Sequence, residues 1–344
     1  MEWATTSIGI RVAECLLMSY RFAFRPYQRR FRQPLQTSHG SWEMREGIIL
    51  RLGDQAGREG WGEIAPLPWF GSETLEQARD FCHQLGEEVT EEEIMTIPEA
   101  LPACQFAFES ALENLQQFSQ KCNTSYSLHS SCWDSKNLSY SCLLPTGEKA
   151  LQTWQAAWEN GERTFKWKIG TRPIQEELQV FDQLMQRLPT TAKLRLDANA
   201  ELSFEEAQEW LRVADEAGNV EFIEQPLSSQ AFEAMLELNA KYSTPLALDE
   251  SVATLNQLER CYQKGWRRIF VIKAAIAGSP MRLRQFCREC AIDTVFSSAL
   301  ETSIGRQAAL KLAAEISSSN RALGFGVNHW FEKNQDNWLE KLWN

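Results

Sequence analysis

Residues 164–170 read TFKWKIG, and the alternation of apolar and charged side chains predicts a β-strand. Successive side chains of a strand point to opposite faces, so Lys166 and Lys168 share one face. Phe165 and Trp167 are their aromatic neighbours. Two like charges side by side on one face repel each other. Other charged groups nearby must therefore compensate for this repulsion.

Similar short apolar runs recur to the end of the chain, and the full set is residues 139–145, 164–170, 192–198, 220–226, 245–251, 268–274, 293–299 and 322–326. Amphipathic stretches of helix length separate them, at residues 176–188, 203–217, 230–240, 254–265 and 279–290. Eight strands alternating with helices predict an α/β protein with a (β/α)8 barrel. An open doubly wound sheet is the alternative.

The first part of the chain predicts a separate α+β domain, residues 1–120, with strand-like and helix-like runs at residues 9–24, 46–54, 72–85 and 102–118. Residues 121–138 are polar and rich in serine without periodicity, which indicates a linker to a barrel of residues 139–327. The tryptophan-containing end, residues 328–344, has no barrel unit to join, so we expect it to pack on the N-terminal domain.

Charged and polar residues fall at the C-terminal ends of consecutive predicted strands, where barrel enzymes carry their chemistry. They are Lys166, Lys168, Arg195, Asp197, Asn199, Glu224, Asp249, Glu250 and Lys273. Three of the carboxylates, those of Asp197, Glu224 and Asp249, can converge at one edge of the barrel mouth. Their mutual repulsion predicts a hard divalent cation between them. Mg²⁺ is the default, and Mn²⁺ is a possible substitute.

The lysines of the flanking strands would face each other across this ion. A general base works best with a pKa of about 7 to 8, well below the usual lysine value of about 10.4. The cation of Lys166 and the metal would disfavour protonation of Lys168 and make it a base. Asn199 could orient Asp197. Arg195 and Glu250 could either support the site or form structural ion pairs.

These motifs resemble the enolase superfamily, whose pattern is matched by KWK at residues 166–168, DAN at 197–199, EQP at 224–226, DES at 249–251 and the lysine at 273. Within it, residues 60–78 and 296–305 resemble the o-succinylbenzoate synthase family. The resemblance implies a modified, enolase-like TIM barrel closed by the N-terminal domain as a cap. It also implies that Asp197, Glu224 and Asp249 bind Mg²⁺.

For function, the resemblance implies dehydration of 2-succinyl-6-hydroxy-2,4-cyclohexadiene-1-carboxylate to 2-succinylbenzoate, on the way to menaquinone or phylloquinone. Lys168 would remove the proton next to the carboxylate and protonate the departing hydroxyl, while the metal and Lys273 stabilise the enediolate. Cap segments at residues 25–32 and 66–68 would close the pocket. The residues that could bind the succinyl tail are Ser297, Ser298, Gly324 and Gly326.

Composition argues against other partners. The net charge of −11 disfavours a broad nucleic-acid surface. Residues 25–34, RPYQRRFRQP, are the basic exception, either as a solvated loop or as a contact for an anionic small molecule. No apolar run is long enough for a membrane helix and no secretory signal is recognisable, so we expect a cytoplasmic protein. The sequence leaves the oligomeric state open.

Two rival functions remain. An N-acylamino acid racemase or dipeptide epimerase would use Lys168 and Lys273 to exchange protons on opposite faces of its substrate. A barrel that serves only as a scaffold would need none of these charged groups.

Overall fold

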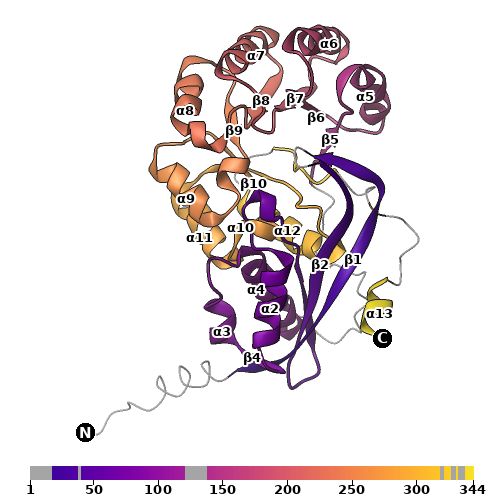
Figure 1. Ribbon diagram of the computed structural model, residues 1–344, viewed down its shortest axis with the longest axis vertical. Helices are drawn as coiled ribbons and strands as arrows, with labels where there is room; N and C mark the ends of the chain where they lie inside the picture. Colours follow the sequence, from indigo (N-terminus) through magenta and orange to yellow (C-terminus); the bar gives the residue numbers. More distant parts are fainter. Residues whose placement is uncertain (1–17, 38–39, 121–137, 318–320, 327–330, 332–337) are drawn as a thin grey trace.

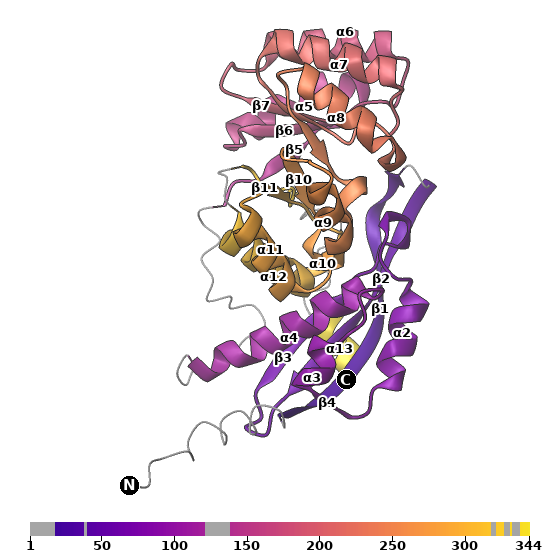
Figure 2. The same ribbon diagram turned by 90° about the vertical axis from the view of Figure 1, so that its left-hand side faces the viewer.

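The structure, a computed structural model, describes residues 18–37, 40–120, 138–317, 321–326, 331 and 338–344. The predicted linker lies outside the described residues except for Leu138, as do residues 9–17 of the first predicted strand. The chain forms a barrel and a cap, with the C-terminal helix α13 (Trp338–Trp343) beside the cap (Figures 1 and 2). No helix of the described residues is long and apolar enough to cross a membrane.

The cap is built on an antiparallel sheet in the order β3-β2-β1-β4. Its strands are β1 (Ser19–Thr37), β2 (Gly40–Gly53), β3 (Glu59–Ile64) and β4 (Glu88–Thr90), and its helices are α2 (Leu75–Gln84), α3 (Glu91–Met95) and α4 (Pro102–Gln120). Two glycines of β3 bring α4 against the sheet. A Cβ atom at Gly62 would lie 2.1 Å from the Ala107 carbonyl oxygen, and one at Gly60 would lie 2.1 Å from that of Ala111. The predicted α+β cap is confirmed.

The barrel strands are parallel and lie in the order β11-β10-β9-β8-β7-β6-β5. They are β5 (Ser141–Leu143), β6 (Thr164–Lys168), β7 (Lys193–Asp197), β8 (Val220–Glu224), β9 (Leu246–Leu248), β10 (Ile269–Ile272) and β11 (Asp293–Phe296). The helices that follow them are α5 (Ala150–Glu159), α6 (Ile174–Arg187), α7 (Phe204–Ala217), α8 (Phe232–Lys241), α9 (Leu255–Gln263), α10 (Ala274–Ala277), α11 (Pro280–Cys290) and α12 (Ser303–Ile316). Seven of the eight predicted strands are thus confirmed.

The eighth predicted strand closes the barrel through isolated bridges instead of a full strand. Leu323 exchanges backbone hydrogen bonds with residues 139 and 141 at one edge of the sheet, at 2.8 and 2.9 Å. Gly324 bonds Phe296 and Ser298 at the other edge, at 2.8 and 3.1 Å. Residues 322–326 therefore join β5 to β11, and the α/β barrel is confirmed in place of the doubly wound sheet.

Residues 25–34 lie within strand β1, so the expectation of a loop at this place is wrong. Two arginines of this strand stack on aromatic rings of the C-terminal residues. The Arg29 guanidinium lies 4.9 Å from the Trp338 ring centroid, and that of Arg25 lies 5.3 Å from Trp343. Tyr27 also packs edge-on against Trp338, at 5.7 Å between centroids. The basic segment thus holds the C-terminal helix to the cap through cation–π contacts.

The cap is joined to the barrel by a buried carboxylate. Glu63 of β3 is fully buried, and it accepts hydrogen bonds from the backbone N–H groups of Thr302 and Gly305 at the start of α12, at 2.8 to 2.9 Å. The hydroxyl groups of Thr302 and Tyr27 donate to it as well, both at 2.5 Å. A negative charge at a helix N-terminus is favourable, and here it comes from the other domain.

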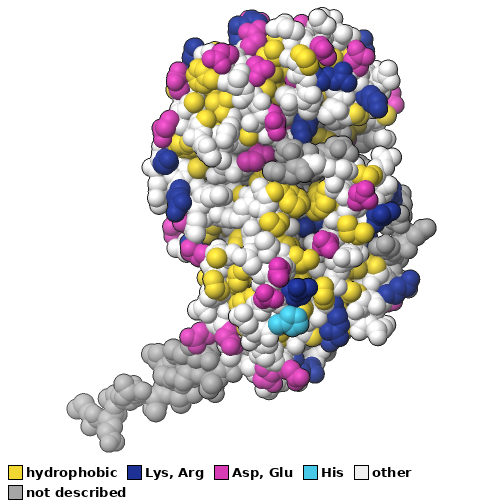
Figure 3. Space-filling view, in the orientation of Figure 1, with side chains coloured by type: hydrophobic (Ala, Val, Ile, Leu, Met, Phe, Trp, Pro, Cys, Tyr) yellow, Lys and Arg dark blue, Asp and Glu magenta, His cyan; other side chains and the backbone are white. Residues whose placement is uncertain are grey.

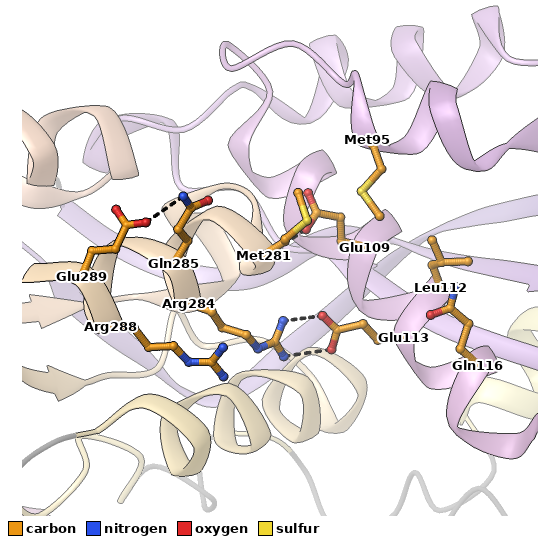
Figure 4. Close-up of a pocket in the computed structure, with 10 residues that line it drawn as sticks. All are labelled: Met95, Glu109, Leu112, Glu113, Gln116, Met281, Arg284, Gln285, Arg288 and Glu289. Atoms are coloured by element: carbon orange, nitrogen blue, oxygen red, sulfur yellow. Dashed lines mark hydrogen bonds and ion pairs between the residues drawn. The ribbon is translucent and has the colours of Figure 1, made fainter. Parts of the chain in front are cut away.

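A second connection borders an open groove of about 420 Å³ between α4 and α11 (Figure 4). Arg284 of α11 points at Glu113 of α4 and forms a two-pronged ion pair with it. Figure 3 shows that hydrophobic side chains gather across the middle of one face of the molecule, where cap and barrel adjoin. The ion pair of Arg284 and Glu113 therefore connects the cap to the barrel.

We expect Glu63→Gln to lower the free energy of unfolding by about 3 kcal/mol, because the amide would turn donor hydrogens toward groups that are themselves donors. Glu59→Gln on the same strand is the control, since the Glu59 side chain is 41% exposed and, among the described residues, pairs only with Arg51 at 2.9 Å. It should change the free energy by about 0.5 kcal/mol or less. Chemical denaturation measures both, and equal effects of the two variants would contradict the role given to Glu63.

Candidate active site

Three of the predicted residues lie in one row across neighbouring strands. The strand register pairs Lys168 with Asp197 and Asp197 with Glu224. Residues paired in register on parallel strands point to the same face of the sheet. Asp249 follows β9, and Lys273 follows β10. The strands that carry the carboxylates therefore lie between the strands of Lys168 and Lys273.

Lys166 neutralises two of the carboxylates. Its Nζ lies 2.8 Å from Asp197 Oδ2 and 2.8 Å from Glu224 Oε1. On the other flank, Lys273 donates to both oxygens of Asp249. Among the described residues, the Lys168 ammonium has no recorded hydrogen bond or ion pair. The two lysines of the KWK motif thus differ: Lys166 is engaged with carboxylates, and Lys168 is available to a substrate.

Burial dominates the electrostatics of this row. It raises the pKa of Glu224 to about 8, with the negative charge of Asp197 adding to the effect. It raises the pKa of Asp249 to about 6, against the opposing attraction of Lys273. Burial alone would lower the pKa of Lys166, but the charges of Asp197 and Glu224 outweigh it, so this pKa is raised. The carboxylates are therefore held where their negative charge is costly, and positive charge stabilises them.

The donor set suits a hard divalent ion, since three buried carboxylates at adjacent strand ends supply the oxygen ligands that Mg²⁺ and Mn²⁺ prefer. Their oxygens contact lysines, however. In the described part of the chain, no three acidic, histidine or cysteine side chains are gathered into a metal cage. The three carboxylates therefore suit a divalent ion in their chemistry and in their position on the strands. In this structure their oxygens contact Lys166 and Lys273.

The segments after β7 and β9 are joined by hydrogen bonds beside these carboxylates. The backbone N–H of Asn199 donates to Asp197 Oδ1 at 3.2 Å, and its side-chain amide donates to Glu250 Oε1 at 3.3 Å. Asn199 has a φ of 44°, in the left-handed region that asparagine tolerates better than most residues. Asn199 thus links Asp197 to Glu250, so two of the three residues that the sequence analysis named as possible supports lie beside the carboxylate row.

Gln225 is a residue that the sequence analysis missed. It is fully buried, and its Oε1 accepts from the backbone N–H groups of Asp249 and Ser251, at 3.0 and 3.2 Å. Its amide also donates to Ser251 Oγ at 2.8 Å. One side chain therefore fixes the backbone that carries Asp249 relative to β8. The EQP motif contained this residue, but the sequence could not show that its amide reaches the next strand.

Arg195 takes the structural role that the sequence left open. It lies in the middle of β7, not at its end, and its guanidinium pairs with Glu221 at 2.7 Å. Arg321 joins the same carboxylate at 2.7 Å and also pairs with Asp293. Arg195 further packs over the ring of Phe222 inside the barrel, at 4.8 Å. This network lies at the opposite end of the strands from Asp197, so the strand-end position expected for Arg195 is wrong.

The residues named for the succinyl tail have partners within the barrel wall. Ser298 Oγ donates to the Glu301 carboxylate at 3.1 Å and accepts from the Leu300 N–H at 2.9 Å. Within the described part of the chain, the only hydrogen bond of Ser297 Oγ is a long one of 3.4 Å to the Gly324 carbonyl. A Cβ atom at Gly324 would lie 3.0 Å from Ser297 Cβ and 3.2 Å from its Cα, so close packing disfavours a larger residue there.

The same packing explains Gly326, where a Cβ atom would lie 2.3 Å from the Ser141 carbonyl oxygen. Both glycines therefore serve the closure of the barrel, whatever else their backbone does. Residues 327 and 328, at the end of the GFGVN segment, lie outside the described residues.

Glu301 is a buried acid that the sequence analysis did not single out. Only 5% of it is exposed, and burial raises its pKa from 4.5 to about 7. Besides Ser298, the backbone N–H of Ala299 donates to its carboxylate at 2.6 Å. The adjoining carbonyl of Leu300, a residue with a φ of 59°, accepts from the buried Arg45 of the cap at 3.2 Å. Glu301 thus shapes the segment between β11 and α12.

Comparison with known proteins identifies both halves of the chain. A family model for the N-terminal domain of MenC matches residues 26–115, and the model described as enolase C-terminal domain-like matches residues 149–341. The chain is 40% identical to the o-succinylbenzoate synthase of Thermosynechococcus vestitus, over 90% of this chain and 93% of that protein. It is 27% identical to the o-succinylbenzoate synthase of Haemophilus influenzae, over 79% of each chain.

Solved structures agree. The o-succinylbenzoate synthase of Thermosynechococcus elongatus, complexed with Mg in the active site, superposes with a TM-score of 0.82 at 38% identity, over 94% of this chain and 99% of that one. A dipeptide epimerase from Enterococcus faecalis superposes with a TM-score of 0.74 at 21% identity, over 89% and 90%. The second likeness concerns the fold alone. The resemblance to the enolase superfamily and to its o-succinylbenzoate synthases is confirmed.

Glu301 gives the fold a measurable pH dependence. The pKa of Glu301 is higher in the folded chain than the usual 4.5. The protonated side chain therefore contributes its full stability below pH 4.5, and this contribution is lost as the pH rises through about 7. We expect Glu301→Gln to remove this loss, so its stability relative to wild type should rise by about 2 to 3 kcal/mol between pH 5 and pH 8. Denaturation at several pH values measures it, with the exposed Glu289→Gln as control. A constant difference over this range would contradict the assignment.

Proposed function

The chain belongs to the o-succinylbenzoate synthase family of the enolase superfamily, and on this basis we propose a catalytic role for each residue of the site. The chain is a carbon–oxygen lyase. It removes water from 2-succinyl-6-hydroxy-2,4-cyclohexadiene-1-carboxylate to give 2-succinylbenzoate, a precursor of menaquinone and phylloquinone. The observation that carries the assignment of roles is the row of Lys168, Asp197 and Glu224 in strand register, followed by Asp249 and Lys273 on the next two strands.

The reaction uses Mg²⁺, and we propose that Mn²⁺ can substitute for it. The ligands that we propose are Asp197, Glu224 and Asp249, because their burial raises the cost of uncompensated negative charge. When bound, the ion supplies a Lewis acid that stabilises negative charge developing on the substrate carboxylate. The ammonium groups that hold these oxygens would have to yield to it, and Lys166 would stay close as a neighbouring positive charge.

Lys168 is the proposed base. Its Nζ removes the proton from the ring carbon next to the carboxylate, and the electrons of the broken C–H bond move into the enediolate. The same Nζ then gives that proton to the hydroxyl group on the adjacent carbon. The C–O bond breaks, water leaves and the ring becomes aromatic. One lysine can serve both steps because the two groups lie on the same face of the ring, which makes the elimination syn.

Lys273 acts from the other flank. The strands of Asp197, Glu224 and Asp249 separate it from Lys168 in the sheet. We propose that its ammonium stabilises the enediolate without moving a proton, since a fixed positive charge in a partly buried site needs no reorganisation during the reaction. Asn199 and Glu250 act by orienting Asp197, as the contacts of Asn199 suggest.

For the succinyl tail we propose Ser297, whose hydroxyl is only weakly engaged. The hydroxyl of Ser298 is already bonded to Glu301 and Leu300, and the amide of Gly324 is bonded to Phe296, so these two residues are weaker candidates.

We propose a cap of residues 1–120, a linker of residues 121–138, a barrel of residues 139–327 and a C-terminal segment of residues 328–344. A cytoplasmic location is supported by the free state of the described cysteines, Cys82, Cys104, Cys142, Cys261, Cys287 and Cys290.

Epimerisation is the second candidate, because Lys168 and Lys273 flank the carboxylates as a two-base reaction would require, and epimerases share the fold. The cap favours dehydration, since residues 26–115 match the N-terminal domain of MenC. A scaffold without activity would have no use for buried carboxylates paired with lysines.

We expect the wild-type protein with Mg²⁺ to convert the cyclohexadiene to the aromatic product, seen by its ultraviolet absorbance, and to lose this activity in a chelator until Mg²⁺ is restored. Lys168→Ala should reduce kcat by about 10⁴-fold, because the base and the acid are lost together. Lys264→Ala, an exposed lysine at the end of α9, should behave as wild type. Rapid racemisation of N-acyl amino acids with the cyclohexadiene left unchanged would identify an epimerase instead.

A further inference from the structure

Lys273 is held between a carboxylate of the barrel and an aromatic ring of the cap. Its Nζ donates to both oxygens of Asp249 and also lies 3.8 Å from the centroid of the Phe70 ring. Phe70 ends the short 3-10 helix η1 (Pro68–Phe70) of the cap. The position of this ammonium group therefore depends on the cap as well as on the barrel.

Hydrogen bonds fix the segment that carries Phe70. The Leu67 N–H donates to Ser72 Oγ at 2.7 Å, and the Phe70 N–H donates to the Leu67 carbonyl at 2.9 Å. Gly71 follows with a φ of 118°, which glycine adopts without strain, and its N–H donates to the Pro68 carbonyl at 3.2 Å. Backbone and side-chain hydrogen bonds thus close the turn immediately before and after Phe70.

The rest of the cap holds this turn at both ends. The buried carboxylate of Glu73 accepts from the backbone N–H groups of Ala103 and Cys104 at the start of α4, at 3.0 and 2.8 Å. At the other end, the Pro66 carbonyl accepts from the buried Arg45 at 2.8 Å. Phe70 is therefore presented to Lys273 from a rigid support, although its own ring is only half-buried.

An aromatic ring acts on a lysine differently from a carboxylate. The face of the ring attracts a cation, but it accepts no proton and leaves the positive charge unneutralised. The attraction grows where water is excluded, and the side chain of Lys273 is only 12% exposed. The ring can therefore fix the direction of the ammonium while leaving its charge for the substrate.

We propose that Phe70 is a positioning residue, whose ring holds the Lys273 ammonium on its own face of the substrate through cation–π attraction and not through packing alone. The proposal rests on the proposed function, because it concerns the same reaction. It gives the cap a part in the chemical step in addition to enclosing the substrate.

Phe70→Leu and Phe70→Met remove the ring and keep the side chain apolar, whereas Phe70→Tyr keeps the ring. We expect kcat for dehydration to fall about tenfold in the Leu and Met variants, with KM changed less than about twofold, because the contact acts on the transition state. The Tyr variant should stay within about threefold of the wild-type kcat. Thermal melting of each variant tests whether it is folded, and two non-aromatic variants guard against the misfolding of one.

The adjacent Trp69→Leu is the matched control. Its side chain is 42% exposed and packs edge-on against Trp42, with 5.0 Å between centroids, so its kinetics should equal those of wild type. The proposal is overturned if a folded Leu or Met variant keeps the wild-type kcat, if Leu and Tyr lose equally, or if only KM changes. Absence of dehydration in the wild-type protein would instead contradict the proposed function, so the two failures are distinguishable.

Discussion

Three carboxylates from neighbouring strands, those of Asp197, Glu224 and Asp249, are buried close together, and the cost of their repulsion governs the rest of the site. Burial and mutual repulsion raise the pKa of Glu224 to about 8. The charged form of such a group is stabilised by positive charge beside it. The structure supplies that charge from two lysines, Lys166 and Lys273, on the strands that flank the carboxylates. The two lysines of the KWK motif therefore differ in their surroundings: Lys166 pairs with two of the carboxylates, and Lys168 is the residue that we propose as the base.

The barrel and the cap both serve this charge arrangement. Parallel strands in register bring side chains that are far apart in sequence into one row, and the buried amide of Gln225 fixes the backbone of Asp249 within it. The cap is anchored by Glu63 at the N-terminus of α12, and its Phe70 contacts Lys273 from above the strand ends. The cap thus meets the barrel both at the start of α12 and at a lysine of the site.

The sequence predicted the parts of the fold that depend on local periodicity. Seven barrel strands, five of the barrel helices and the charged row could be read from it, because apolar spacing and strand ends are local features. Helices α5, α10 and α12 were not among the predicted ones. Residues 322–326 formed bridges instead of a strand, since their pairing is set by the two edges that they join. Residues 25–34 looked like a basic loop, yet the arginines lie in strand β1, where they stack on C-terminal aromatic rings. The roles of Arg195, Gln225, Glu63 and Phe70 depend on partners distant in sequence, which no local pattern reveals.

The most direct test is a crystal structure of the protein grown with Mg²⁺ and 2-succinylbenzoate. The account predicts one ion bound by oxygens of Asp197, Glu224 and Asp249 at about 2.1 Å, with the product between Lys168 and Lys273. An ion bound elsewhere, carboxylates still paired with the lysines in its presence, or both lysines on one side of the product would contradict it.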